Sequence, residues 1–293
     1  MNSYILKRCV ERLIERFGIR SAMSACQKKI NGISTVRINN VSVLIPRIYG
    51  ITCQSSEPWM VDLLLWLLRR RTGTFLDIGV NLGQTLIKVK AIDPERKYIG
   101  FEPNSTCVFY VQNLIRLNGF KNCTVVPVGL FNCDAIQELN LYSEDQADSA
   151  ASIIKEYRPW NKIYFKTFVP MFCFTQVEKI ITTGVVSIIK IDVEGSELEV
   201  VESLAEVIAR DRPIMLVEVL PVYSIHNVLR KNRQEELERI VAAVGYVMWR
   251  VVKTGSGKFA GIKKIETIGI HSDLSQCDYL FMPEDYRIVE YEM

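Results

Sequence analysis

The sequence has no long uninterrupted hydrophobic stretch. Its longest candidate, from Met60 to Leu68, contains Asp62 and is followed at once by three arginines. Because a membrane span needs about 18 apolar residues, we expect a soluble protein. Neither sign of charge dominates: 36 basic and 33 acidic residues leave a formal net charge of +3, which gives no reason to expect a nucleic-acid partner. Apolar residues make up 48% of the 293 and charged residues 24%, which excludes disordered, collagen-like and coiled-coil chains.

Paired cysteines are also missing. None of the eight cysteines forms a Cys-x-x-Cys pair, and neither of the two histidines lies near enough to one to suggest a zinc knuckle. The first residues lack the basic-then-apolar order and the cleavage site of a signal peptide. We therefore expect reduced thiols and a cytoplasmic location.

The N-terminal segment differs from the rest of the chain in charge. Residues 1–30 carry seven basic side chains against two acidic ones, a local net charge of +5. Apolar residues recur there at helical spacing, which predicts a basic amphipathic helix. Such a helix can lie on an anionic membrane surface or pack on the domain or a partner subunit, and we favour packing.

From Thr74 onward, short β-branched runs alternate with longer segments of helical periodicity. The apolar run 185–191 is typical of a strand buried on both faces of a parallel sheet, and a capping box at 196–199 predicts a helix start. Repeated strand–helix units imply an α/β fold, a mostly parallel sheet with helices on both faces. We expect one domain over 51–293, with residues 1–50 as an N-terminal extension. Strands are predicted at 75–78, 97–101, 124–128, 185–191, 214–219, 246–252 and 278–282, and helices from 84, at 105–117, 196–209 and 234–244.

The most informative stretch is the Gly-rich turn after the strand at 75–78. Asp77 ends the strand, and Gly79 and Gly83 would let the backbone approach a ligand. Glu102 ends the next strand, where an acid can accept hydrogen bonds from both ribose hydroxyls of an adenosine. A dinucleotide site would place glycine where Asp77 stands, and an acid there disfavours a pyrophosphate. The pattern instead favours S-adenosylmethionine, which carries positive charge.

A second acidic turn, Lys190 to Ser196, ends the strand at 185–191. Strand periodicity places Lys190, Asp192 and Glu194 on one face. The two acids could serve as a general base, as ligands of a divalent ion, or as a clamp on the cofactor's ammonium. Alternatively, Lys190 pairs with a carboxylate and Glu194 favours the next helix N-terminus. Glu218 ends the following strand and could meet both acids, in which case repulsion would raise at least one pKa or recruit a metal.

At these residues the chain resembles the FkbM family of S-adenosylmethionine-dependent methyltransferases. The matching segments are 75–85, 100–119 and 188–202, and the resemblance covers roughly 50–285. It implies a Rossmann-like sheet of seven strands, the last antiparallel. It also implies that Asp77, Gly79, Asn81 and Gly83 surround the amino-acid part of the cofactor, Glu102 its ribose, Asn104 the adenosine and Val128 with Gly129 the adenine, while Glu57, from an acid–proline pair, lies against the cofactor.

The family resemblance implies methyl transfer to an oxygen, commonly a hydroxyl of a sugar, a glycan or a secondary metabolite. We expect the base for that hydroxyl among Asp192, Glu194 and Glu218. The alternatives are a non-catalytic S-adenosylmethionine-binding partner subunit and a nicotinamide-dependent oxidoreductase. A loosely matched serine-bearing segment, 148–152, is expected near the site. The aromatic-rich segment 155–175 departs from the family and either walls an acceptor pocket or belongs to the core, which we favour for about half of its aromatic residues.

Overall fold

The computed structural model describes residues 31–155 and 157–286 of the chain. The basic amphipathic helix predicted within residues 1–30 lies outside the described residues. No helix among the described residues has the length and apolar character to cross a membrane.

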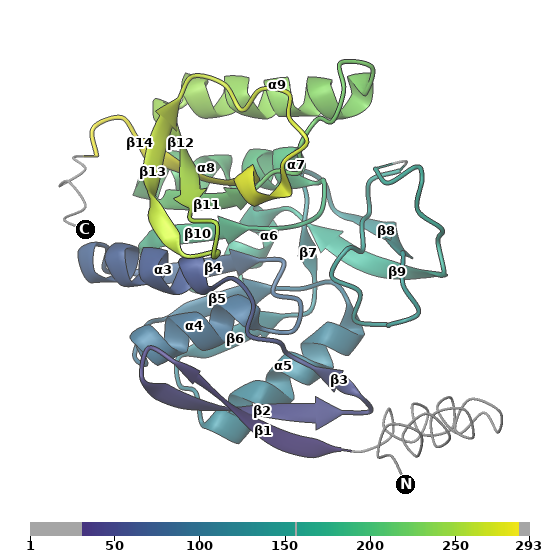
Figure 1. Ribbon diagram of the computed structural model, residues 1–293, viewed down its shortest axis with the longest axis vertical. Coiled ribbons are helices and arrows are strands. Elements are labelled where there is room, and N and C mark those ends of the chain that lie inside the picture. Colours follow the sequence, from purple (N-terminus) through teal and green to yellow (C-terminus); the bar gives the residue numbers. More distant parts are fainter. Residues whose placement is uncertain (1–30, 156, 287–293) are drawn as a thin grey trace, which may run out of the picture.

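A mixed sheet of eight strands forms the centre of the molecule (Figure 1). The pairs between β11, β10, β4, β5 and β6 are parallel, and the remaining three pairs are antiparallel. The expected α/β fold, mostly parallel with an antiparallel last strand, is thus confirmed. In sheet order the strands are β13 (Phe259–Ile265), β12 (Tyr246–Lys253), β14 (Asp278–Pro283), β11 (Ile214–Glu218), β10 (Val186–Ile191), β4 (Thr74–Ile78), β5 (Tyr98–Phe101) and β6 (Cys123–Val126).

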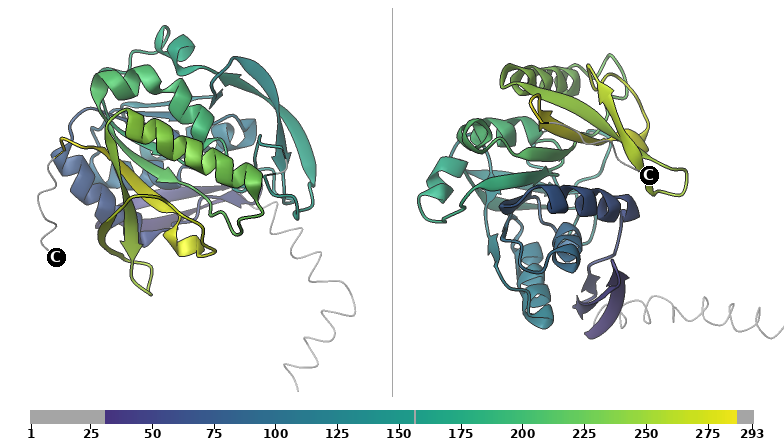
Figure 2. Two further views of the ribbon diagram at one scale, coloured as in Figure 1. Left: turned by 90° about the horizontal axis from the view of Figure 1, so that it is seen from above. Right: turned by 90° about the vertical axis from the view of Figure 1, so that its left-hand side faces the viewer.

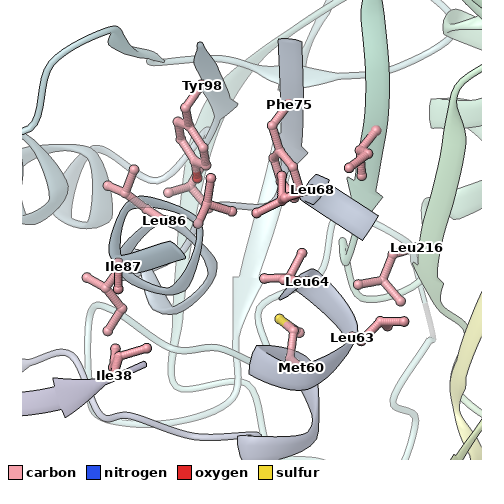
Figure 3. Packing of buried hydrophobic residues seen from close by; sticks show 14 of the residues in the cluster. Ile38, Met60, Leu63, Leu64, Leu68, Phe75, Leu86, Ile87, Tyr98 and Leu216 are labelled. Carbon is pink, nitrogen blue, oxygen red and sulfur yellow. The ribbon is translucent and has the colours of Figure 1, made fainter. Parts of the chain in front are cut away.

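Helices cover both faces of this sheet (Figure 2). Figure 3 shows Met60 and Leu64 of the first helix packed with Leu86 of the second and with Phe75 and Tyr98 of the sheet. The helices packed on this face are α3 (Pro58–Arg70), α4 (Gln84–Ile92) and α5 (Ser105–Asn118), and those on the other are α6 (Phe174–Glu178), α7 (Glu197–Ser203), α8 (Ala205–Asp211) and α9 (Val228–Ala243), with a short 3₁₀ turn η1 (Leu274–Gln276) before β14.

Strand order reverses between β4 and β10. The chain runs from β4 outward through β5 and β6, then returns to β10 and continues to β11 on the other side. In open α/β sheets, ligands bind beyond the carboxyl ends of the strands at such a reversal. Asp77 of β4 and Lys190 of β10 are register partners close to this edge, so both side chains leave the same face of the sheet.

Residues 32–52 form a separate three-stranded sheet that packs beside α5. Its strands are β1 (Gly32–Ile38), β2 (Val41–Ile48) and β3 (Ile51–Thr52). Ile38, Val43 and Ile45 join the same core cluster as α3 and α4. The buried Tyr110 hydroxyl fastens this sheet to α5, because it donates to the Pro46 carbonyl at 2.7 Å and accepts the Cys53 amide at 2.7 Å.

A third sheet lies beyond the carboxyl edge of the central one and consists of β7 (Gly129–Leu130), β9 (Phe165–Phe172) and β8 (Ala135–Leu141). Its inward side chains, Leu139, Leu141, Val169 and Met171, form a small core cluster. The expectation for the aromatic segment 155–175 was largely wrong. Of its seven aromatic side chains only Tyr157 and Phe174 are buried, and the other five, Trp160, Tyr164, Phe165, Phe168 and Phe172, are exposed.

Three predictions from the sequence, one on the number of strands and two on helix bounds, also need correction. The sheet has eight strands rather than seven, because β13 adds a half-exposed edge strand whose apolar pattern is interrupted by Gly261 and two lysines. The helix predicted at 196–209 is two helices, α7 and α8, joined at Leu204, and Ser196 makes no side-chain cap hydrogen bond. α9 begins at Val228 rather than at Gln234, because its first turns are mainly polar and carry little apolar periodicity.

Candidate active site

A cavity of about 340 Å³ opens at the carboxyl edge of the sheet, where the loops after β4, β5 and β10 meet the end of β11. This volume is at the low end for sites of small molecules. The cavity collects most of the residues singled out in the sequence and the predicted serine-bearing segment. Its lining includes Glu57, Gly79, Asn81, Glu102, Asn104, Gly129, Asp192, Glu194 and Glu218 together with Asp148, Ser149 and Ala151, whereas Asp77, Gly83 and Val128 do not line it.

The Gly-rich turn is shaped by contacts within the protein. Gly79 has φ +90°, and a Cβ there would lie 1.9 Å from the Asp192 carbonyl oxygen. Gly83, with φ +88°, precedes α4, and a Cβ there would lie 2.9 Å from Leu114 Cδ2. The two glycines therefore let the turn pass close to β10 and α5, and only Gly79 also borders the cavity.

Glu102 follows β5 and is buried at the cavity. Its two carboxylate oxygens accept the backbone amides of Asn81 and Asn104, each at 2.8 Å. Burial raises the pKa of Glu102 to about 7, and the two amide donors limit the rise. Asn104 holds the adjoining loop, since its side chain accepts the Thr106 amide at the start of α5 and donates to the Gln146 carbonyl at 2.7 Å. Its side-chain amide is therefore already used within the protein.

Asp77 lies beneath the cavity and is fully buried. One carboxylate oxygen accepts the Tyr98 hydroxyl. The other has no hydrogen-bond partner among the described residues and lies 3.8 Å from the Lys190 ammonium. Burial raises the pKa of Asp77 to about 6, against the effects of Lys190 and Tyr98. Asp77 itself does not line the cavity, whereas its neighbour Lys190 does.

Lys190 connects the buried acid to the cavity. Its ammonium donates to Asp192 Oδ2 at 2.9 Å, so the Lys–carboxylate pair considered in the sequence is present. The charge of Asp192 raises the pKa of Glu218 far above its usual range, and burial and Asp278 raise it further. The expectation that repulsion raises the pKa of at least one of these acids is confirmed. The raised pKa favours the protonated form of Glu218, beside an acid that is paired with Lys190.

Glu194 occupies a different position from the one expected. β10 ends at Ile191, and Glu194 lies in the following turn with φ +53°, so strand periodicity does not extend to it. Its carboxylate accepts Arg158 Nη2 at 2.6 Å. Burial and the charge of Asp192 raise the pKa of Glu194 to about 7, and Arg158 opposes the rise. Arg158 is a site neighbour that the sequence analysis missed.

Glu57 lines the cavity from the start of α3, in a left-handed conformation with φ +56°. The fully buried ammonium of Lys88 lies 3.4 Å from Glu57 Oε2 and 3.7 Å from the sulfur of Met60. Burial lowers the pKa of Lys88, and Glu57 opposes this effect. Lys88 is therefore a second missed neighbour, whose visible signal is a lysine flanked on α4 by Ile87 and Val89.

Among residues 31–155 and 157–286, no group of three or more His, Cys, Asp or Glu side chains is arranged to hold a metal ion. A strand reversal with a carboxyl-edge cavity beside a Gly-rich turn and a strand-final acid is the arrangement of α/β nucleotide-binding proteins. A family model described as the methyltransferase FkbM domain matches residues 77–248. The chain therefore belongs to the FkbM family of S-adenosylmethionine-dependent methyltransferases, as the sequence resemblance indicated.

Individual relatives are distant. A tRNA (guanine-N(7)-)-methyltransferase of Hydrogenovibrio crunogenus is 28% identical over 134 residues, 46% of this chain and 51% of that protein. The chain thus spans about half the length of the curated relative it matches. The crystal structure of methyltransferase FkbM from Methylobacillus flagellatus gives a TM-score of 0.44 at 14% identity, over 72% of this chain and 43% of that one. The SAH-bound methyltransferase PaMTH1 of Podospora anserina gives 0.39 at 8%, over 77% and 76%.

Proposed function

We propose that this protein transfers a methyl group from S-adenosylmethionine to a hydroxyl group of a sugar, a glycan or a secondary metabolite. The observation that carries the proposal is that one cavity brings together the buried carboxyl group of Glu102 and the Lys190-paired carboxylate of Asp192. The first suits the ribose of the cofactor, and the second suits the proton of an alcohol.

The charges at the cavity fit a cationic cofactor. Six carboxyl groups and one ammonium, that of Lys190, line it, and two of the carboxyl groups pair with cations outside the lining, Glu57 with Lys88 and Glu194 with Arg158. A sulfonium with an α-ammonium group matches such a lining, whereas the pyrophosphate of a nicotinamide dinucleotide would meet mostly acids. The two Glu102 oxygens each keep a lone pair beyond the backbone amides they accept, and these can receive the ribose hydroxyls. The lining therefore supports the methyltransferase hypothesis over the oxidoreductase.

The residues of the chain would chiefly align the acceptor. S-adenosylmethionine, when bound, supplies a methyl group on a sulfonium, whose leaving group is neutral. Asp192 would take the proton of the acceptor hydroxyl on Oδ1, because Oδ2 already accepts Lys190. Glu218, whose raised pKa favours its protonated form, would donate a hydrogen bond to the acceptor. Glu194, fixed by Arg158, would limit the space available to the acceptor.

A small hydroxylated acceptor suits this cavity better than a nucleic acid. The curated relative is named for a tRNA guanine, but the charged side chains that line the cavity here are carboxyl groups apart from Lys190. Carboxylates repel a phosphate backbone, whose binding depends on lysine and arginine. We also propose a cytoplasmic location, where the six described cysteines, all free thiols, would stay reduced.

Calorimetry on the purified chain tests the cofactor. We expect S-adenosylhomocysteine to bind and NAD and NADP not to bind. Glu102→Ala should abolish binding, and Glu236→Ala, an exposed acid on α9, should leave it unchanged. Binding of a nicotinamide cofactor alone, or of none of the three, would contradict the proposal. A non-catalytic partner subunit would show the same binding and is distinguished by its failure to methylate any acceptor in a screen of hydroxylated compounds.

The affinity for S-adenosylhomocysteine should rise between pH 6 and pH 8. The carboxyl group of Glu102 has its pKa raised to about 7 and must lose its proton to accept two ribose hydroxyls. Below that pKa the affinity should fall by up to about tenfold per pH unit. The folding stability of the free protein depends on pH with the opposite sign. Because the pKa of Glu102 is raised in the folded state, its carboxyl group stabilises the fold fully below about pH 4.5, and this contribution is lost as the pH rises to about 7.

Calorimetric titrations across this pH range check the prediction. Glu102→Gln should bind weakly with a flatter profile, whereas Glu194→Gln should keep the slope that Glu102 contributes. A Glu102→Gln profile as steep as that of the unmodified protein would show that another group controls the affinity.

A further inference from the structure

The outer surface of β8 and β9 exposes large apolar side chains that the proposed function does not use. Ile136 is 68% exposed and Phe168 is 72% exposed. Ile136 lies opposite Pro170, and Phe168 lies opposite Glu138, in the antiparallel register. Residues that alternate along β9 share this side, which adds Phe172. We call the aromatic face the exposed residues Ile136, Phe168 and Phe172 of the sheet together with Trp160, Ile163 and Tyr164 of the segment before β9.

The aromatic face is distinct from both the core and the cavity. The opposite side of the same sheet packs Leu139 and Met171 into its small core, and these two also line the cavity. The turn before β9 adds Trp160, which is 94% exposed. An exposed concentration of large apolar residues of this kind marks an interaction surface rather than ordinary surface variation.

Positive charge is interleaved with these apolar residues. The sequence from Lys155 to Phe172 holds four basic residues and one acid, Glu156. Arg158 pairs with Glu194 at the cavity, which leaves Lys155, Lys162 and Lys166 for this segment. The Lys162 ammonium lies 4.4 Å from the centre of the Tyr164 ring. Lys166 forms an exposed ion pair with Glu138 at 2.8 Å, so this acid is neutralised on the face itself. Both lysines lie in the run of exposed residues that precedes and enters β9.

We propose that the aromatic face docks on the surface of a membrane that contains anionic lipids. Phenylalanine and isoleucine side chains can enter the acyl boundary, and tryptophan and tyrosine favour the headgroup level, where one end is apolar and the other wet. Lysines extend their charge toward lipid phosphates while their stems cover apolar surface. A protein partner would need a complementary shape and hydrogen-bonding groups, and this face offers few such groups. A fluid lipid surface needs neither.

Flotation of the full chain with vesicles tests the docking directly. We expect binding to vesicles of phosphatidylcholine with phosphatidylglycerol, and weaker binding to phosphatidylcholine alone. Trp160→Ser with Phe168→Ser should lower the partition coefficient about tenfold or more, from the loss of apolar burial. Lys162→Gln with Lys166→Gln should remove the preference for anionic vesicles.

A matched control is available away from the aromatic face. Ile180 and Val185 are 86% and 64% exposed and lie just before β10, at the amino end of the strand. Ile180→Ser with Val185→Ser should leave vesicle binding unchanged. Thermal unfolding of every variant checks that the fold is retained.

Brominated lipids give a second readout, because they quench only tryptophans close to the acyl chains. Of the other three tryptophans, Trp59 and Trp66 are buried and Trp249 is half-buried against the core, so we expect most of the quenching to disappear in Trp160→Ser. Failure of the full chain to bind anionic vesicles would overturn the proposal. Unchanged binding by Trp160→Ser with Phe168→Ser would also overturn it and assign the binding to another basic segment, such as residues 1–30. A dimer in size-exclusion chromatography that these substitutions dissociate, without vesicle binding, would show instead that the face joins two copies of the chain.

Discussion

Asp192→Asn is expected to lower turnover by about 10²- to 10⁴-fold, the range of general-base catalysis. Affinity for S-adenosylhomocysteine should change far less. Asparagine keeps an oxygen that can accept the Lys190 ammonium, now 2.9 Å from Asp192 Oδ2, so the geometry should persist. What is lost is the ability to take a proton from the acceptor hydroxyl.

The measurement is single-turnover methyl transfer to a hydroxylated acceptor found by screening, with calorimetry of S-adenosylhomocysteine on the same preparations. Glu178→Gln is the matched control, because Glu178 also pairs with a basic side chain, Arg210, at 2.8 Å but lies away from the cavity. Turnover by Asp192→Asn equal to that of the unmodified protein would exclude Asp192 as the base. Parallel losses of turnover and cofactor affinity would make it a binding residue instead.

Gly79→Ala should cost about 3 kcal/mol or more of unfolding free energy, because left-handed strain and overpacking act together. The new Cβ would lie 1.9 Å from a backbone oxygen, that of Asp192, at φ +90°. Backbone cannot rotate away as a flexible side chain can. The loops after β4 and β10 would have to separate, and cofactor binding should be lost with them.

Urea unfolding checks this prediction, and Gly119→Ala provides the comparison. Gly119 follows α5 with φ +62°, but a Cβ there would meet nothing within 4 Å. This substitution should cost only the backbone strain, about 1 kcal/mol, and leave binding intact. Equal losses of stability in the two variants would show that the contact with Asp192 relaxes without cost.

The parallel strands could be predicted because each is a short apolar run next to a turn or helix signal, as in 185–191. β13 could not be predicted, because an edge strand is covered on fewer sides. It therefore tolerates lysines, which interrupt the apolar pattern of the strand. The aromatic segment misled for a related reason. Composition shows that side chains are apolar, but only the register of β8 and β9 shows that Phe168 points away from the core.

The residues around the cavity were largely identified from short motifs, because the ends of parallel strands must meet at one edge. The basic residues that pair with them were not identified, because these are distant in the chain. Lys88 is 31 residues from Glu57, and Arg158 is 36 residues from Glu194. The burial of Asp77 was also hidden. It depends on Tyr98, 21 residues later on the neighbouring strand, whose hydroxyl bonds to the carboxylate. A local sequence motif does not name the partner of a residue that is distant in the chain.

The left-handed backbone at the cavity places activity and stability in opposition. Glu57, Asn81 and Glu194 line the cavity with φ of 56°, 48° and 53°, a conformation that side-chain-bearing residues adopt at a cost of about 1 kcal/mol each. Glycine would relieve the strain but remove the polar group. Selection for thermal stability alone would therefore replace these three cavity residues early. A stabilised variant of the protein should keep these three positions and carry its stabilising substitutions elsewhere, in the sheet.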